Sequence, residues 1–287
     1  GSYLLFLVLF LAFPVLVSSG RVGIKICLIY LKQNNKNNVK IFNYASQCVV
    51  KSVLKIAKPV FISNNTKEIQ VIFHHMSCVQ NQKTNEIFIE DTIDTLAFPN
   101  AKLFPLNGLF EIWSLEKIYG LIGGGIIWCK DKKTSESIKK IVNENKRNFD
   151  YIWILRILSI FSKSIRKIWD KKEIENFSIP WWAINQFEPS FLHDKNELIN
   201  RQKKYKLLAS FLPNWYLVDN KRLPSSVPII IDDYKAKLIK SLGFKTDFRH
   251  FEIFSKSGST FIKFFPIPIH YQVPINKLEE VIRILKK

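Results

Sequence analysis

Three features of this chain could together do covalent chemistry: a lysine, a carboxylate and a helix start made of small residues. Lys117 ends the segment Ser-Leu-Glu-Lys, Asp91 follows a short apolar run, and Gly20 opens a stretch with helical spacing. A lysine amine can form a Schiff base with an aldehyde, and a helix N-terminus can receive a phosphate. A carboxylate in the same site can pair with a positively charged ring nitrogen. Together they predict a site for an aldehyde cofactor that carries a phosphate and a ring nitrogen.

Alternating strands and helices must bring these residues together. Three runs rich in β-branched or aromatic residues precede the acid: residues 39–42, 59–62 and 69–73. A helical stretch over 48–56 separates the first two, and this alternation predicts βαβ units and a mostly parallel sheet. A further strand over 86–89 runs into Glu90 and Asp91. The acid is therefore expected at the carboxyl edge of the sheet, where open α/β sheets bind their ligands.

Composition narrows the class of protein. The chain has 287 residues, of which 47% are hydrophobic, so it can bury the core of one large domain and a smaller one. Its four cysteines form no C-x-x-C pair, which argues against a zinc knuckle or a disulfide framework and favours reduced thiols in the cytoplasm. The formal net charge is +19, but the lysines are spread over every segment. Nucleic acid is therefore not expected as a partner.

Two apolar segments leave alternatives open. Residues 3–17 are almost wholly apolar, but they lack the basic start of a signal peptide and include Pro14, so we expect a buried helix or strand that leads into the core. Residues 150–185 are aromatic and basic, with apolar residues at the spacing of one or two amphipathic helices. These helices would pack on their own domain, or they would form a dimer contact or a peripheral membrane contact.

The expected fold class is α/β, in three parts. Residues 1–150 are expected to form a three-layer αβα large domain with a mostly parallel sheet, followed by amphipathic connecting helices over 151–205. Residues 206–287 read as a small C-terminal α/β domain that ends in a helix. The proposed site lies wholly in the first part.

Short motifs along the chain resemble the DegT/DnrJ family of sugar aminotransferases, which are fold-type I enzymes that depend on pyridoxal 5′-phosphate (PLP). The motifs follow the family's order: SSGRVGIKICLIYL, KPVFI, VIFHHMS, FIEDTIDTL, WSLEKIYGLIGGGIIWCKD and FFPIPIHYQVPINKLEEVIRIL. The resemblance covers about residues 15–145 and 225–287 and leaves the middle unmatched. Each motif is short, so their shared order carries the resemblance.

The resemblance implies a role for each matching residue. Lys117 would be the lysine that binds PLP covalently and moves a proton during the reaction. Asp91 would pair with the ring nitrogen. The phosphate ligands would be Ser114 and the backbone amides near Gly20 and Arg21.

Three further positions bear on the cofactor. His75 looks like the family's strand-end histidine beside the cofactor, or it is a hydrogen-bonded core histidine. Tyr44 is the nearest candidate for the aromatic residue that stacks on the ring. Asp94 stands where the family has Gln or His, and it would put a second acid near the cofactor. The chain would thus be a divergent member, with a short or absent upstream segment.

Each of the main residues also has a plainer interpretation. Lys117 could be a surface lysine on a helix, and Asp91 could cap a helix after a strand. The glycines at 123–125 could form a tight turn into a strand over 126–129. We prefer the cofactor role for Lys117 because Gly120 and this glycine cluster follow it, as the resemblance requires.

The function implied by the resemblance is amino transfer to a keto sugar that is attached to a nucleotide, with glutamate as the amino donor. Such an enzyme would serve surface polysaccharide or lipopolysaccharide synthesis as a cytoplasmic homodimer, with each active site built from both subunits. Association with a membrane is left open, and no metal is expected. The alternative is a catalytically degenerate relative that keeps the fold and acts as a binding or scaffolding partner.

Overall fold

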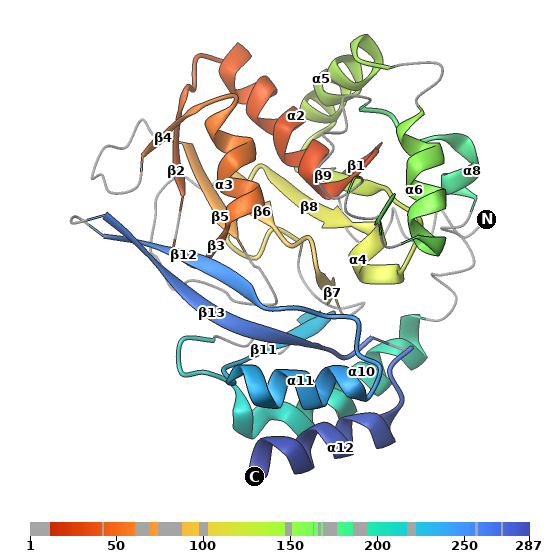
Figure 1. Ribbon diagram of the computed structural model, residues 1–287. Coiled ribbons are helices and arrows are strands. Elements are labelled where there is room, and N and C mark those ends of the chain that lie inside the picture. The colour runs from red at the N-terminus through yellow and green to blue at the C-terminus, as the bar shows by residue number, and fades with distance from the viewer. Residues whose placement is uncertain are drawn as a thin grey trace.

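The computed structural model has a seven-stranded, a four-stranded and a two-stranded sheet. Helices pack around the two larger sheets (Figure 1). The structure describes residues 12–41, 43–60, 69–73, 88–97, 103–146, 151–162, 164–165, 168, 177–185, 194–216, 222–255, 258–270 and 272–287. The larger sheet is built from the first half of the chain. The smaller sheet and the helices beneath it in Figure 1 come mainly from the C-terminal part.

The larger sheet has seven strands in the order β1-β9-β8-β6-β5-β2-β4. In chain order these strands are β1 (Phe13–Val17), β2 (Asn38–Ile41), β4 (Lys58–Val60), β5 (Ile69–Phe73), β6 (Ile89–Asp91), β8 (Phe110–Ser114) and β9 (Gly125–Cys129). The five strands from β8 to β4 run parallel, and β9 and β1 are antiparallel to their neighbours. The mostly parallel sheet is as predicted. The strand expected over 86–89 is seen as β6 over Ile89–Asp91, which includes both acids, and residues 86 and 87 lie outside the described residues.

Three helices, α2 (Gly20–Gln33), α3 (Gln47–Leu54) and α5 (Lys132–Glu144), accompany this sheet. Helix α2 forms because its apolar residues recur at helical spacing and because the Ser19 hydroxyl accepts a hydrogen bond from the Val22 amide. Its buried side chains pack in one core with strand residues such as Ile112 and Ile127. This packing fixes the start of α2 at the edge of the sheet.

The smaller sheet has four strands in the order β11-β13-β12-β3. Its strands are β11 (Ser226–Ile229), β13 (Gly258–Pro268), β12 (Arg249–Ser255) and β3 (Ala45–Ser46). The helices α10 (Asp194–Leu208), α11 (Asp233–Ser241) and α12 (Ile275–Lys286) lie beside it, with the short 3-10 helix η2 (Ala209–Phe211). Strand β3 comes from the N-terminal half of the chain, so the two halves share this sheet.

A two-stranded ladder makes a second connection between the halves. Strand β7 (Thr95–Ala97) follows Asp94 and pairs antiparallel with β10 (Arg222–Pro224). The amide of Ser225 also donates to the carbonyl of Asp94 at 2.9 Å. The segment that carries the two predicted acids is therefore held by backbone bonds from the C-terminal part.

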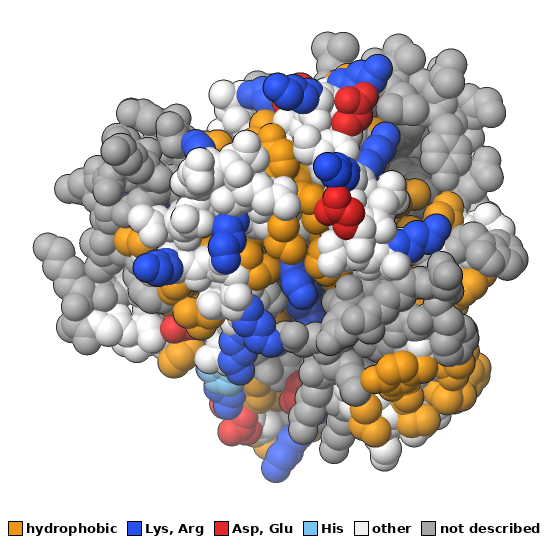
Figure 2. All heavy atoms as spheres, turned by 90° about the horizontal axis from the view of Figure 1, so that it is seen from above, with side chains coloured by type: hydrophobic (Ala, Val, Ile, Leu, Met, Phe, Trp, Pro, Cys, Tyr) orange, Lys and Arg blue, Asp and Glu red, His pale blue; other side chains and the backbone are white. Residues whose placement is uncertain are grey.

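The aromatic middle of the chain forms the helices α6 (Ile152–Phe161) and α8 (Trp181–Ile184) within the described residues. Trp153 is buried and packs edge-on to Trp182, as expected for a helix that packs on its own domain. The other side of α6 exposes Ile154, Ile157, Leu158 and Phe161. Figure 2 shows hydrophobic side chains gathered at one corner of the face seen from above, while lysine and arginine side chains are scattered. No helix in the described part of the chain is long and apolar enough to cross a membrane.

Candidate active site

The start of α2 meets the end of β8 at the edge of the large sheet. A Cβ atom on Gly20 would come 2.8 Å from the Ile93 side chain and 3.3 Å from Cβ of Ser114. The first amides of a helix have no acceptor within the helix, and they carry the positive end of its dipole. Gly20 and Ser114 thus lie against each other at a helix start, a kind of position that can bind an anion, and these two residues are named the cradle. Arg21 follows in the first turn of α2, with its side chain exposed.

The glycine cluster lets β9 approach this cradle closely. A Cβ atom on Gly125 would lie 2.8 Å from the carbonyl carbon of Ser19 and 2.9 Å from the carbonyl oxygen of Trp113. The amide of Gly124 donates to the Ser18 carbonyl at 2.9 Å, and Gly124 has a φ of +101°. The cluster therefore makes the expected turn into β9 and also brings the start of α2 against the sheet.

Lys117 lies on α4 (Leu115–Tyr119), a short helix that follows β8 directly. Ser114 is its N-cap, and the helix ends at Gly120, whose φ of 71° suits a glycine. The amide of Leu115 donates to the carbonyl of Gly124 at 3.0 Å, which links the helix to the glycine turn. The Lys117 side chain is half-buried, so it is not a surface lysine in contact with solvent alone.

Asp91 is buried at the end of β6, and its Oδ1 accepts a hydrogen bond from the Ile93 amide at 3.2 Å. Burial raises the pKa of the Asp91 carboxyl to about 7; the nearby Lys117 ammonium pulls this pKa down and the Asp94 carboxylate pushes it up. Both groups are thus close enough to act on Asp91. The structure therefore brings together Asp91, Lys117 and Asp94, with Ser114 and the start of α2 beside them.

The structure does not place two other predicted residues, Tyr44 and His75, in this site. Tyr44 has a φ of 62° between β2 and β3, and its ring stacks on Trp215, with 4.9 Å between the ring centroids. That contact places the Tyr44 ring against the C-terminal core. His75 lies outside the described residues.

Buried charged residues on β8, β10 and β6 form a network that no sequence motif indicates. Glu111 of β8 accepts hydrogen bonds from Arg222 at 2.6 and 3.1 Å, from Trp113 Nε1 at 2.7 Å and from the Phe104 amide at 2.7 Å. Glu90 accepts from the Gly108 amide at 2.6 Å, yet burial and the charge of Glu111 raise its pKa to about 7. Glu90 appears in the acidic pair of the sequence motif, but no sequence signal connects Glu111 with a residue so distant along the chain.

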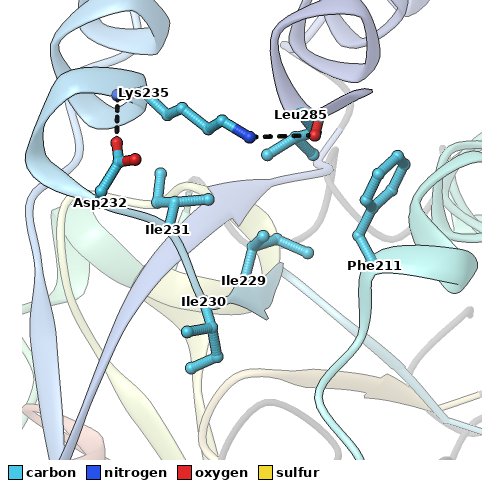
Figure 3. Close-up of a pocket in the computed structure, with 7 residues that line it drawn as sticks. All are labelled: Phe211, Ile229, Ile230, Ile231, Asp232, Lys235 and Leu285. Atoms are coloured by element: carbon cyan, nitrogen blue, oxygen red, sulfur yellow. Dashed lines mark hydrogen bonds between the residues drawn. The ribbon is translucent and has the colours of Figure 1, made fainter. Parts of the chain in front are cut away.

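A pocket in the C-terminal part has different chemistry. It has a volume of about 220 Å³, and Figure 3 shows the residues that line it: Phe211, Ile229, Ile230, Ile231, Asp232, Lys235 and Leu285. Lys235 Nζ donates to the Leu285 carbonyl at 3.2 Å. Asp232 is the N-cap of α11, and its Oδ1 accepts a hydrogen bond from the Lys235 amide. Its polar groups thus serve local structure, and none of its lining residues belongs to the candidate site.

The residues at the sheet edge match the functional groups that PLP requires. Ser114 of the cradle is the N-cap of the short helix that carries a half-buried lysine, and a buried carboxylate lies within electrostatic reach of that lysine. No cluster of His, Cys, Asp and Glu among the described side chains could hold a metal ion. The set therefore fits an organic phosphate cofactor that a lysine can bind covalently.

Comparison with protein families agrees with this chemistry. A family described as "Putative PLP-dependent aminotransferase" matches residues 9–277, which is nearly the whole chain. The chain therefore belongs to this family of PLP-dependent aminotransferases. The search of curated proteins found no match.

Solved structures show the same fold. A DegT DnrJ EryC1 StrS aminotransferase from Brucella abortus has a TM-score of 0.64 and 11% identity, over 95% of this chain and 85% of that one. The sugar aminotransferase CalS13 from Micromonospora echinospora gives 0.64 and 11%, over 95% and 86% of the two chains. PseC from Helicobacter pylori, an aminotransferase involved in pseudoaminic acid biosynthesis, gives 0.62 and 11%, over 98% and 88%. The predicted fold class is thereby confirmed, since the chain shares the fold of these aminotransferases.

Proposed function

We propose that this chain transfers an amino group to a keto sugar attached to a nucleotide, with PLP bound to Lys117. The observation that carries the proposal is the meeting of Lys117, Asp91 and the cradle at Gly20 and Ser114, at one edge of the sheet. That edge is where open α/β sheets bind ligands.

Each residue has a separate task in this proposal. When bound, PLP supplies an electron-withdrawing ring that stabilises negative charge on the substrate carbon that loses its proton. Lys117 Nζ holds the cofactor and, once free, takes and returns that proton. The Asp91 carboxylate holds the positive charge of the ring nitrogen. The Ser114 hydroxyl and the amides of Gly20 and Arg21 hold the phosphate, and His75 is the candidate for packing against the ring. Tyr44 is not proposed for that role, because its ring stacks on Trp215.

Two observations support a sugar nucleotide as the substrate. Sugar aminotransferases share the fold over nearly the whole chain, and one of them is involved in pseudoaminic acid biosynthesis. The formal net charge of +19 favours an anionic substrate such as a nucleoside diphosphate. We therefore propose a role in surface polysaccharide or lipopolysaccharide synthesis in the cytoplasm, with glutamate as the amino donor.

We also propose that the enzyme is a homodimer. The exposed apolar side chains of α6, with Phe161 83% exposed, form a surface that a second copy would cover. Light scattering of the purified chain would be expected to give the mass of two subunits. Phe161→Glu should shift the mass toward one subunit, whereas the same change at the exposed Phe261 of β13 should not.

An absorbance spectrum with added PLP tests the cofactor role. We expect a visible band of lysine-bound PLP that borohydride fixes on Lys117, as peptide mass spectrometry would show. Lys117→Ala should lose both the band and the transfer reaction. Lys140→Ala is the matched control, because the Lys140 side chain is 79% exposed on α5, and it should keep both.

The identity of the substrate needs a second measurement. Nucleotide-linked amino sugars and free amino acids would be added separately to the PLP-loaded protein, and loss of the visible band would report amino transfer. A change with glutamate and with an amino sugar nucleotide supports the proposal. If the band changes with amino acids but not with an amino sugar nucleotide, the proposed sugar substrate is wrong.

One residue favours the second candidate function, a catalytically degenerate protein that keeps the fold as a binding or scaffolding partner. Asp94 is buried and raises the pKa of Asp91, which opposes the ionised form that a ring nitrogen requires. A protein that binds PLP without a visible band, or that does not bind it, would support this candidate instead.

A further inference from the structure

Two arginines from the middle of the chain hold the residues on either side of Lys117. Arg156 lies on α6 and Arg201 on α10, in the part of the chain that the family motifs leave unmatched. Arg156 binds Glu116, which precedes Lys117, and Arg201 binds Ile118, which follows it. The short helix α4 is thus held from two directions around the lysine.

The contact with Arg156 joins α6 to both ends of the lysine segment. Its Nη2 lies 2.5 Å from Oε1 of Glu116, and its Nε donates to the carbonyl of Ile122 at 2.5 Å. The Arg156 side chain is only 11% exposed, so its charge is largely removed from water. One guanidinium therefore ties the residue before Lys117 to the loop that leads into the glycine cluster.

The contact with Arg201 comes from the opposite side and lies deeper. Arg201 is fully buried, its Nε donates to Glu197 Oε1 at 2.8 Å, and its Nη2 donates to the carbonyl of Ile118 at 3.3 Å. Carbonyls in the last turn of a helix have no partner within the helix. A cation there also interacts favourably with the negative end of the helix dipole. Arg201 thus caps the helix that carries Lys117.

This arrangement is costly for a purely structural contact. Arg201 Nη1, Glu197 Oε2 and the Tyr205 hydroxyl are buried without a hydrogen-bond partner in the described part of the chain. A buried ion pair commonly contributes little net stability and can be replaced by apolar residues without loss. An isolated helix as short as α4 is not stable, so its position depends on such outside contacts.

We propose that Arg156 and Arg201 are positioning residues that set the direction of the Lys117 side chain toward Asp91. The proposal rests on the role of Lys117 proposed above. It also connects the site with the C-terminal part, because Lys204, on the same helix as Arg201, donates to the His270 carbonyl at 2.8 Å. A displacement of that part relative to the large sheet would then move α4.

The test compares Arg156→Met and Arg201→Met with Arg156→Lys and with Arg283→Met, since Arg283 is exposed on α12. The first readout needs no cofactor: trace labelling with acetic anhydride, read by peptide mass spectrometry as the reactivity of Lys117 relative to Lys140. The second readout is the pH at which the visible band of the PLP-loaded protein changes. Circular dichroism checks that each variant is folded.

We expect the two Met variants to change the relative reactivity of Lys117 by roughly tenfold, the factor that corresponds to about 1.4 kcal/mol. Arg156→Lys should restore part of the difference, and Arg283→Met should have no effect. Glu116→Gln should change the reactivity of Lys117 as Arg156→Met does. The double variant should add little to the effect of either single variant, because both changes break the same ion pair.

The outcomes separate the two proposals. Variants that lose thermal stability while the reactivity of Lys117 and the pH of the band stay unchanged would overturn the positioning role. If Arg201→Met does not fold, Arg156→Met and Glu116→Gln decide the matter at partly exposed positions. If the parent protein shows no band, the cofactor role of Lys117 fails, whereas the labelling still shows whether the arginines orient the lysine.

Discussion

Arg222 Nη1 lies 2.6 Å from Oε1 of Glu111, and the two side chains are 2% and 0% exposed. Burial pushes the pKa of Glu111 up, but the charge and hydrogen bonds of Arg222 outweigh it and hold this pKa below its ordinary value. Glu111 is therefore ionised, and the pair joins a strand of the C-terminal half to the strand that ends at Ser114.

Breaking this pair from one side should be strongly destabilising. Arg222→Met leaves a buried carboxylate without its partner, and we expect a loss of about 3–5 kcal/mol in the free energy of unfolding, measured by urea denaturation. The exposed pair of Lys263 and Asp233, 2.9 Å apart, provides the control. Lys263→Met should cost much less, because an ion pair between exposed side chains is screened by water. Equal small losses at the two positions would contradict the account.

The elements of the site could be predicted from local sequence, whereas this pair could not. The helical spacing of apolar residues after Gly20 was enough to place α2, and the run of β-branched and aromatic residues over 69–73 was enough to place β5. Glu111 lies in β8, but its partner is 111 residues away along the chain. The local sequence does not show that this carboxylate is buried, because its burial depends on a strand pairing that forms only in the folded chain.

The position of the acids shows a similar limit. The sequence placed Glu90 and Asp91 after a strand, whereas the structure places both within β6 and buries them. Buried charges are rare without partners, and the partners of Glu90 are the amides of Leu106 and Gly108. A loop with these amides carries no sequence signature, so the expected end of the strand was too early.

Replacing Asp94 should improve cofactor binding near neutral pH. The Asp94 carboxylate raises the pKa of Asp91, so Asp94→Asn should lower that pKa from about 7 and leave more Asp91 ionised. We expect PLP affinity, measured by absorbance titration, to rise severalfold at pH 6.5–7 and to change little above pH 8, where Asp91 is ionised in both proteins. Asp247→Asn, at an exposed position, should have no effect. Weaker binding of Asp94→Asn at every pH would mean that Asp94 contacts the cofactor directly.

The approach of β9 to α2 gives a third prediction. In Gly125→Ala the new methyl group would meet the backbone of Ser19, Gly20 and Trp113 at 2.8–2.9 Å, so the start of α2 must move away from the sheet. We expect a loss of about 1–3 kcal/mol in unfolding free energy, together with weaker PLP binding because the phosphate cradle is displaced.

Gly23 of α2 is the control for the change at Gly125 of β9. A methyl group on Gly23 would lie 3.0 Å from a methyl group of the Ile112 side chain, which can shift. In addition, alanine is more stable than glycine in a helix interior. Gly23→Ala should therefore lose less stability than Gly125→Ala and should keep PLP affinity. Similar losses of affinity in both variants would contradict a specific role for the close approach at Gly125.

The last prediction concerns pH and His270. Burial and the charges of Arg201 and Lys204 lower the pKa of the His270 imidazole to about 4, whereas an unfolded histidine has a pKa near 6.5. Between these values the unfolded chain binds more protons than the folded one, so this residue makes stability rise with pH and contributes fully above about pH 6.5. The contribution of His270 to the free energy of unfolding would change by up to about 3 kcal/mol between these two pKa values.

A variant isolates this contribution from the acids of the site. Glu90 and Asp91 have raised pKa values of about 7, so they bind protons in the folded state and make stability fall with pH in the overlapping range. Urea unfolding of the parent and of His270→Asn at pH 4.5, 5.5, 6.5 and 7.5 removes their effect by difference. The difference should grow with pH up to about 6.5 and then level off, whereas His250→Asn, at an exposed position, should parallel the parent. Parallel curves for His270→Asn would show that the imidazole titrates in the folded chain as it does in the unfolded one, and that the charges of Arg201 and Lys204 do not reach it.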